Sequence, residues 1–109
     1  MTTVASLEEV RREIDEAPGV MLYFSTPECN VCKALKPKIS DAFAERFPKI
    51  AQRFVDATDT PDIAAAFQVF SVPTILVFLE GREFARGSRN ISVAQFVQQI
   101  ERPYRLMTA

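Results

Sequence analysis

The residues of this chain best suited to chemistry are its two cysteines, Cys29 and Cys32, which only two positions separate. Of all ways to place two cysteines in a chain of 109 residues, about 2% have this spacing, so it calls for a chemical reason. In thiol–disulfide exchange, a thiolate attacks a disulfide sulfur, and a second nearby thiol resolves the mixed disulfide that forms. The spacing suits that reaction, with a Cys29–Cys32 disulfide as its product.

A helix is expected to begin at the cysteines. Val20–Phe24 is a continuous apolar run, typical of a strand buried on both faces, and a helical period of apolar residues follows from Leu35. At a helix N-terminus, free N–H groups and the positive end of the dipole favour a thiolate. This position predicts Cys29 as the nucleophile and Cys32, one turn later, as the resolving thiol.

Two other interpretations of the cysteine pair are weaker. Two small buried side chains would not need this spacing at a helix start. Two cysteines in a chain without histidine supply half of a zinc site, so a metal would need a dimer or an external thiol. The lack of histidine also excludes catalytic triads and Cys–His protease dyads. With three glycines and no G-x-G-x-x-G motif, the chain is expected to use the cysteine pair itself as its only redox group.

Periodicity and capping signals predict four helices and four strands. The helices are expected at about 6–17, 29–47, 60–67 and 92–103, and the strands at about 20–24, 50–57, 74–79 and 82–86. Helix ends are marked by capping residues and a proline: Ser6 with Glu9, Thr60, Ser92 with Gln95, and Pro103. Pro37 should kink the second helix. The order predicts a three-layer α/β fold whose last two strands form a hairpin at Glu80-Gly81.

Composition narrows the class of protein. A chain of 109 residues with 48% apolar content is expected to form a single domain spanning residues 1–109. Thirteen basic and 14 acidic residues give a net charge of −1, which disfavours nucleic-acid binding, and the arginines, Arg86 among them, are expected to be ordinary surface charge. The longest apolar runs have five residues, too few for a membrane span, and the N-terminal residues resemble no secretion signal. We expect a cytoplasmic, monomeric protein.

The cysteine motif and its surroundings resemble the thioredoxin family over nearly the whole chain. The resemblance lies in Ser25–Lys33, which contains the motif, in Pro37, in Ser71–Thr74 and in Gly81. It implies a thioredoxin-like fold with a central mixed sheet of four to five strands flanked by helices. It also implies that Val72-Pro73 is a cis peptide facing the cysteines and that the Val72 backbone pairs with a substrate chain; a strand-edge proline is the alternative. On this resemblance, we expect disulfide-containing proteins as substrates. We also expect an external reductase, such as a thioredoxin reductase, to reduce the cysteine pair again.

Several positions depart from the pattern of the family. The buried Asp that thioredoxins carry six residues before the first cysteine is Tyr23, and the Lys near it on the next strand is Phe54. Replacing both members of a buried ion pair together is physically coherent, but it leaves Cys32 no obvious base. Tyr23 is expected to pack in the core, with its hydroxyl seeking a neighbour; a proton relay is the alternative.

The motif itself also differs. The family's Trp before the first cysteine is Glu28, and its Gly-Pro between the cysteines is Asn30-Val31. Lys33 favours a thiolate on Cys29 and Glu28 opposes it, so the sign of the net effect stays open. These residues are expected to modulate rate, redox potential and choice of partner.

The sequence therefore predicts a thiol–disulfide oxidoreductase that reduces protein disulfides through Cys29 and Cys32. The alternative is a redox-responsive binding module of the same fold with little turnover, because Tyr23, Phe54 and Glu28 each replace a residue that the family uses for exchange. A glutaredoxin-like activity is weaker, since the turn at Gly81 has one glycine where glutaredoxins have a pair.

Overall fold

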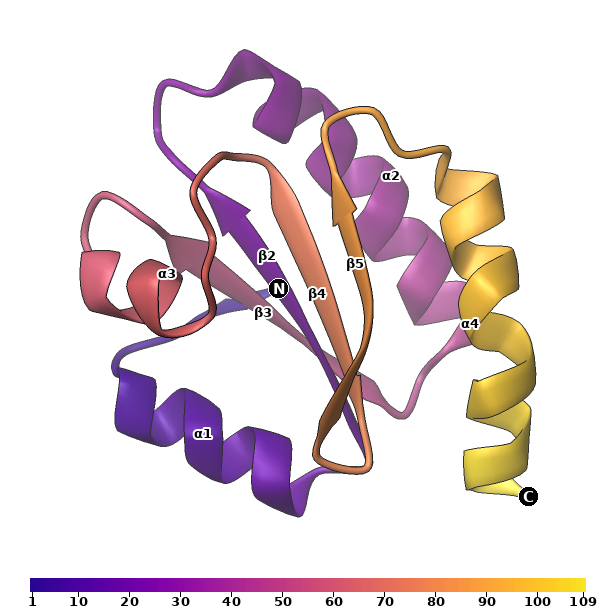
Figure 1. The fold of residues 1–109 in the computed structure, drawn as a ribbon. Helices are drawn as coiled ribbons and strands as arrows, with labels where there is room; N and C mark the ends of the chain where they lie inside the picture. The colour runs from indigo at the N-terminus through magenta and orange to yellow at the C-terminus, as the bar shows by residue number, and fades with distance from the viewer.

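The computed structural model describes all residues 1–109 and has a five-stranded mixed sheet between two layers of helices (Figure 1). Helices α1 and α3 cover one face of the sheet, and α2 and α4 cover the other (Figure 1). In chain order the elements are β1 (Thr2–Thr3), α1 (Leu7–Glu16), β2 (Gly19–Ser25), α2 (Asn30–Arg46), β3 (Ile50–Asp56), α3 (Pro61–Ala66), β4 (Thr74–Leu79), β5 (Arg82–Ser88) and α4 (Val93–Thr108). The predicted three-layer α/β architecture is confirmed.

Strand β2 lies at the centre of the sheet, whose order is β1-β3-β2-β4-β5. It pairs parallel with β3 and antiparallel with β4, and all seven of its residues are buried. Met21 and Tyr23 belong to the core under α2 and α4, while Leu22 and Phe24 belong to the core under α1 and α3. The continuous apolar run of this segment is thus explained by a strand that has a core on each side.

Local capping follows the sequence at two helices and departs from it at a third. The Ser6 hydroxyl accepts a hydrogen bond from the N–H of Glu9 at 3.1 Å, and Ser92 caps α4 in the same way. Thr60 was expected to cap α3, but its hydroxyl instead donates to the carbonyl oxygen of Asp56 at 2.8 Å. The hydrogen-bonded turn that follows β3 therefore uses the hydroxyl that the helix start would have used.

Two elements lie outside the predicted boundaries. Helix α4 continues through Pro103 to Thr108, because Tyr104 is buried and its hydroxyl accepts a hydrogen bond from the N–H of Lys49 at 3.0 Å. This packing of the last turns offsets the backbone bond that a proline removes. Strand β1 was not predicted: its two threonines carry no apolar pattern, and they are extended because they pair parallel with β3.

The hairpin between β4 and β5 turns at Glu80-Gly81, as predicted. Both residues have positive φ angles, 51° and 81°, which a two-residue turn matching the twist of the strands requires. No helix of the chain combines the length and apolarity that a bilayer crossing requires.

Candidate active site

The two cysteines are joined in a disulfide at the N-terminus of α2, with their Cα atoms 5.2 Å apart. Cys29 is the N-cap residue of the helix, and its Sγ accepts a hydrogen bond from the N–H of Cys32 at 3.2 Å. Cys32 lies in the core with 1% of its surface exposed, while Cys29 is partly exposed. A disulfide substrate therefore reaches Cys29 first, and the N–H that contacts its sulfur is placed to stabilise a thiolate there.

The charged and polar residues adjacent to the cysteines in sequence are exposed. Glu28 and Lys33 flank the cysteines and face solvent, which screens their opposing effects on a thiolate. The N-terminus of α2, and not these side chains, therefore favours negative charge on Cys29. Asn30 and Val31 are also exposed, so their side chains are available to a partner.

Tyr23 lies beneath the motif, fully buried on β2. Its hydroxyl donates a hydrogen bond to the carbonyl oxygen of Cys32 at 2.6 Å. Burial raises the pKa of Tyr23 to about 12, so the phenol keeps its proton at neutral pH. The side chain therefore holds the backbone of Cys32 and is unsuited to accept a proton from its thiol.

Phe54 on β3 occupies the place next to Tyr23. The two rings stack with their centroids 6.3 Å apart and an angle of 27° between their planes. The ammonium group of Lys36, from α2, lies 4.5 Å from the centroid of the Phe54 ring, a cation–π contact. An aromatic pair with a cation over the Phe54 ring thus fills the position where the resemblance described above implies a buried ion pair.

The predicted substrate-binding residues lie on the segment that joins α3 to β4, which we call the 67–73 loop. The peptide bond between Val72 and Pro73 is cis, and Pro73 is buried. Val72 packs against the same core as Cys29 and shares a groove with Thr26, whose carbonyl accepts a hydrogen bond from the N–H of Cys29. The structure therefore brings the 67–73 loop and the cysteine motif together.

This groove is a largely apolar cavity of about 390 Å³ between α3 and the 67–73 loop. Ala64, Val69 and Val72 contribute to its walls, and Phe70 stands at its edge with 90% of its surface exposed. Beside this apolar groove, the exposed ring is available to contact a partner. Sequence reasoning missed Phe70, although an aromatic residue two positions before Val72-Pro73 was a usable signal.

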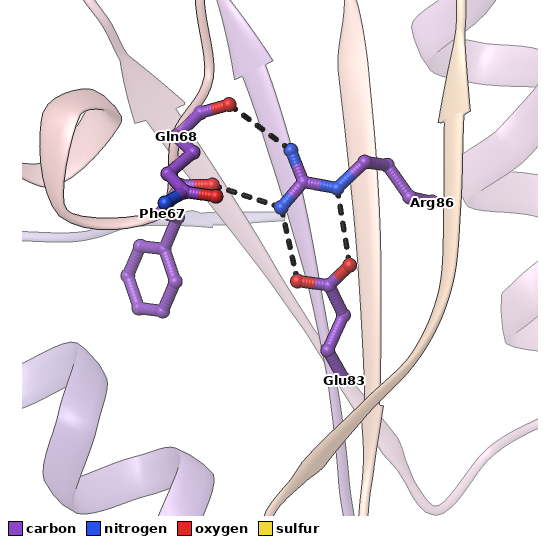
Figure 2. A network of polar contacts seen from close by, with 4 residues as sticks. All are labelled: Phe67, Gln68, Glu83 and Arg86. Carbon is purple, nitrogen blue, oxygen red and sulfur yellow. Dashed lines mark hydrogen bonds and ion pairs between the residues drawn. The ribbon is translucent and has the colours of Figure 1, made fainter.

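Arg86 was interpreted as ordinary surface charge; it is exposed as expected, but its guanidinium is fully engaged in contacts. Its guanidinium binds the carboxylate of Glu83 and the carbonyl oxygens of Phe67 and Gln68, where the 67–73 loop begins (Figure 2). The hydrogen bond to Glu83 is the main cause that raises the pKa of Arg86 above its ordinary value. Nothing in the pattern of β5 shows this contact, because it joins residues that are distant in sequence.

No group of three or more His, Cys, Asp or Glu side chains is arranged to hold a metal ion. The chemically active arrangement is the disulfide itself: an accessible sulfur at a helix start, a buried sulfur behind it and a loop beside both. This arrangement can accept or donate two electrons by exchange with another disulfide or dithiol.

Comparisons with known proteins agree with this chemistry. A family model described as Thioredoxin matches residues 2–102. The chain is 35% identical to the thioredoxin-like protein YdfQ of Bacillus subtilis over 106 residues, which cover 97% of this chain and 94% of that protein. It is 33% identical to human protein disulfide-isomerase A4 over 87 residues, covering 77% of this chain but 14% of that longer protein. Among solved structures, thioredoxin from Trypanosoma brucei brucei superposes with a TM-score of 0.83 at 21% identity, covering 96% and 91% of the two chains.

Proposed function

This chain belongs to the thioredoxin family and has the thiol–disulfide oxidoreductase chemistry of that family, and from this premise we propose that it reduces protein disulfides in the cytoplasm. The observation that carries the proposal is the asymmetry of the Cys29–Cys32 disulfide. Cys29 is partly exposed at the N-terminus of α2, and Cys32 is buried behind it. A nucleophile must reach the substrate, whereas a resolving thiol has to reach only the first cysteine.

The reaction has two steps and starts from the dithiol form. The Cys29 thiolate attacks one sulfur of the substrate disulfide, forming a mixed disulfide, and the other substrate sulfur leaves as a thiolate that takes up a proton. Cys32 then loses its proton and attacks the Cys29 sulfur, which releases the second substrate thiolate and closes the Cys29–Cys32 disulfide. The substrate gains two electrons and the cysteine pair loses two.

The proton of Cys32 needs an acceptor, and the residues around Cys32 restrict what it can be. Tyr23 gives its hydrogen to the Cys32 carbonyl and keeps it at neutral pH, and Phe54 has no ionisable group. The final acceptor that balances the step is the departing substrate thiolate, which the proton reaches through water. We therefore propose that resolution proceeds without a buried protein base.

The 67–73 loop is proposed to hold the substrate chain. The backbone of Val72 would pair with an extended segment beside the target disulfide, in the manner of strand addition. Three exposed or half-buried apolar side chains, Val31, Phe70 and Val72, lie around Cys29 and the groove and would contact apolar side chains of that segment. This surface favours polypeptide disulfides over small ones.

Each cycle leaves the protein oxidised, so a second protein must return two electrons to Cys29–Cys32. The chain has three glycines and no nucleotide-binding glycine motif. We propose an external reductase, such as a thioredoxin reductase, that docks on the same surface as the substrate.

The test is reduction of the disulfides of insulin with dithiothreitol or a thioredoxin reductase as electron donor. The wild-type protein is expected to accelerate the reaction, Cys29→Ser to abolish the acceleration, and Cys32→Ser to accumulate a mixed disulfide. Full activity of Cys29→Ser, or no activity of the wild type with either donor, overturns the proposal.

A second function is favoured by one observation: the Tyr23 hydroxyl, which lies beside Cys32, donates to a backbone carbonyl and does not serve as a base. If resolution is slow for this reason, the protein acts as a redox-responsive binding module that holds a partner and turns over little. A pull-down separates the two functions. Recovery of the same partner by wild type and by Cys29→Ser/Cys32→Ser supports binding without turnover, whereas a partner that depends on Cys29 supports exchange.

A further inference from the structure

The guanidinium of Arg86 on β5 donates four hydrogen bonds (Figure 2). Its Nε and Nη2 donate to the two carboxylate oxygens of Glu83 at 3.0 and 2.9 Å. Its Nη2 and Nη1 also donate to the carbonyl oxygens of Phe67 at 2.8 Å and Gln68 at 3.2 Å. A planar guanidinium can hold a carboxylate and a backbone segment at once, because its donors point in fixed directions. Arg86 therefore ties the edge strand of the sheet to the start of the 67–73 loop.

A β-bulge makes this arrangement possible. Residues three apart on a regular strand project to opposite faces of the sheet. The register between β4 and β5 shifts at Val77/Phe78, so Glu83 pairs with Phe78 and Arg86 pairs with Leu76. Leu76 and Phe78 both belong to the core under α1 and α3, so Glu83 and Arg86 project to that same face. The bulge thus lets Glu83 orient Arg86 toward the end of α3.

The backbone that Arg86 holds is the C-terminal turn of α3. The N–H of Gln68 bonds to the carbonyl of Ala65 at 3.1 Å, and the N–H of Val69 bonds to that of Ala64 at 2.8 Å, which is a Schellman ending. Gln68 has a φ of 57°, a conformation that favours glycine, so this turn depends on contacts from outside the helix. Carbonyl oxygens at a helix C-terminus carry partial negative charge, which the guanidinium complements.

The loop is held at its other end as well. The hydroxyl of Thr74 donates to the carbonyl of Ser71 at 2.7 Å. Between the two contacts lie Phe70, which is exposed at the edge of the apolar groove, and Val72, which lies beside the cysteine motif. Arg86 and Thr74 together fix the segment that the substrate chain would meet.

We propose that Arg86 is a positioning residue for polypeptide substrates. It holds the 67–73 loop, so the backbone of Val72 and the ring of Phe70 are already in place when an extended substrate docks. This inference rests on the proposed function and adds to it a residue that touches neither the substrate nor the reacting sulfurs. If the loop is ordered before the substrate binds, the entropy cost of ordering it no longer reduces the binding free energy. A small disulfide that reaches only Cys29 does not use the loop, so its reaction does not depend on Arg86.

The test compares two oxidants of the reduced protein, insulin and hydroxyethyl disulfide. Single-turnover rate constants are measured by acid quenching, thiol alkylation and mass spectrometry, for wild type, Arg86→Ala, Arg86→Lys and Arg82→Ala. Arg86→Ala is expected to slow the reaction with insulin about threefold to tenfold and to leave that with hydroxyethyl disulfide within about twofold. Arg86→Lys does not restore the insulin rate, because an ammonium lacks the planar fork. Arg82, on the same strand and in none of the ion pairs of the chain, serves as the control and leaves both rates unchanged.

Two results overturn the inference: an unchanged rate of Arg86→Ala with insulin, or an equal loss with both oxidants. If the wild-type protein reacts with neither oxidant, the proposed function fails, and hydrogen exchange tests the loop contact independently. The amides of residues 69–72 should exchange faster in Arg86→Ala than in Arg82→Ala, and equal exchange in the two variants shows that Arg86 does not fix the loop.

Discussion

The hydroxyl of Tyr23 donates its one hydrogen to the carbonyl oxygen of Cys32 at 2.6 Å. The side chain beneath the resolving cysteine therefore contacts its backbone, and a neutral phenol stands where the resemblance to the thioredoxin pattern implies a buried carboxylate. This contact fixes the first turn of α2 and, with it, the position of the Cys32 sulfur behind Cys29.

Removing the phenol oxygen should affect stability and leave exchange nearly intact. Tyr23→Phe loses one buried hydrogen bond, so the free energy of unfolding in urea should fall by about 1 kcal/mol at pH 7. Its exchange rate with insulin should stay within about threefold of wild type, because Tyr23 is not the base. Tyr104→Phe is the matched control: it loses a bond to the N–H of Lys49, remote from the disulfide. A hundredfold slower exchange by Tyr23→Phe alone would show that the phenol takes part in proton transfer.

The same residue should make stability depend on pH in the alkaline range. The pKa of Tyr23 is raised by burial from 10.0 to about 12, so the folded protein keeps a proton that the unfolded chain releases. This contribution is fully present below pH 10 and is lost as the pH rises toward 12, amounting to about 2–3 kcal/mol. Urea unfolding of wild type and Tyr23→Phe across this range measures it. A stability difference between the two proteins that does not change with pH contradicts the prediction.

Tyr23 and Phe54 should be replaceable by an ion pair only together. Tyr23→Asp alone buries a carboxylate without a cation, and the expected loss is about 3 kcal/mol or more. Phe54→Lys alone places an ammonium against the apolar stack and is also destabilising. In the double variant, the loss of unfolding free energy should be smaller than the sum of the two single losses by at least about 1 kcal/mol, measured by a double-mutant cycle in urea. Simple additivity would show that the two positions do not interact.

Phe70 should contribute to the choice of substrate and little to folding. Because 90% of its surface is exposed, Phe70→Ser should change the free energy of unfolding by less than about 0.5 kcal/mol. The rate constant with insulin should fall about threefold or more, while that with hydroxyethyl disulfide should not change. Leu106→Ser, which alters an exposed apolar residue on α4, is the control and should leave both rates unchanged. Equal effects of the two variants would remove Phe70 from the proposed substrate surface.

Much of the fold was accessible from the sequence because local and tertiary preferences agree. The apolar run of β2 predicts a buried strand from its local sequence, and the sheet buries that strand on both faces. The serine caps of α1 and α4 act within one helical turn. The cysteine spacing places both sulfurs in the first turn of α2, so the chemistry could be predicted with the helix. The resemblance to the thioredoxin family added the role of the 67–73 loop.

The features that escaped prediction depend on contacts between distant segments. Pro103 does not end α4, because the buried Tyr104 anchors the turn beyond it. Strand β1 exists because an edge of β3 was free to pair, which two threonines do not reveal. Arg86 reaches the 67–73 loop because a bulge in β5 turns Glu83 to the same face, and no local pattern encodes that register.

The most direct test of the exchange chemistry is the site at which a mixed disulfide forms. Reduced Cys32→Ser and Cys29→Ser are each mixed with insulin, quenched in acid and analysed by mass spectrometry after digestion. We predict a stable insulin adduct at Cys29 in the Cys32→Ser protein and no adduct at Cys32 in the Cys29→Ser protein, because Cys32 is 1% exposed. An adduct at Cys32, or none at Cys29, would contradict the assignment of Cys29 as the nucleophile.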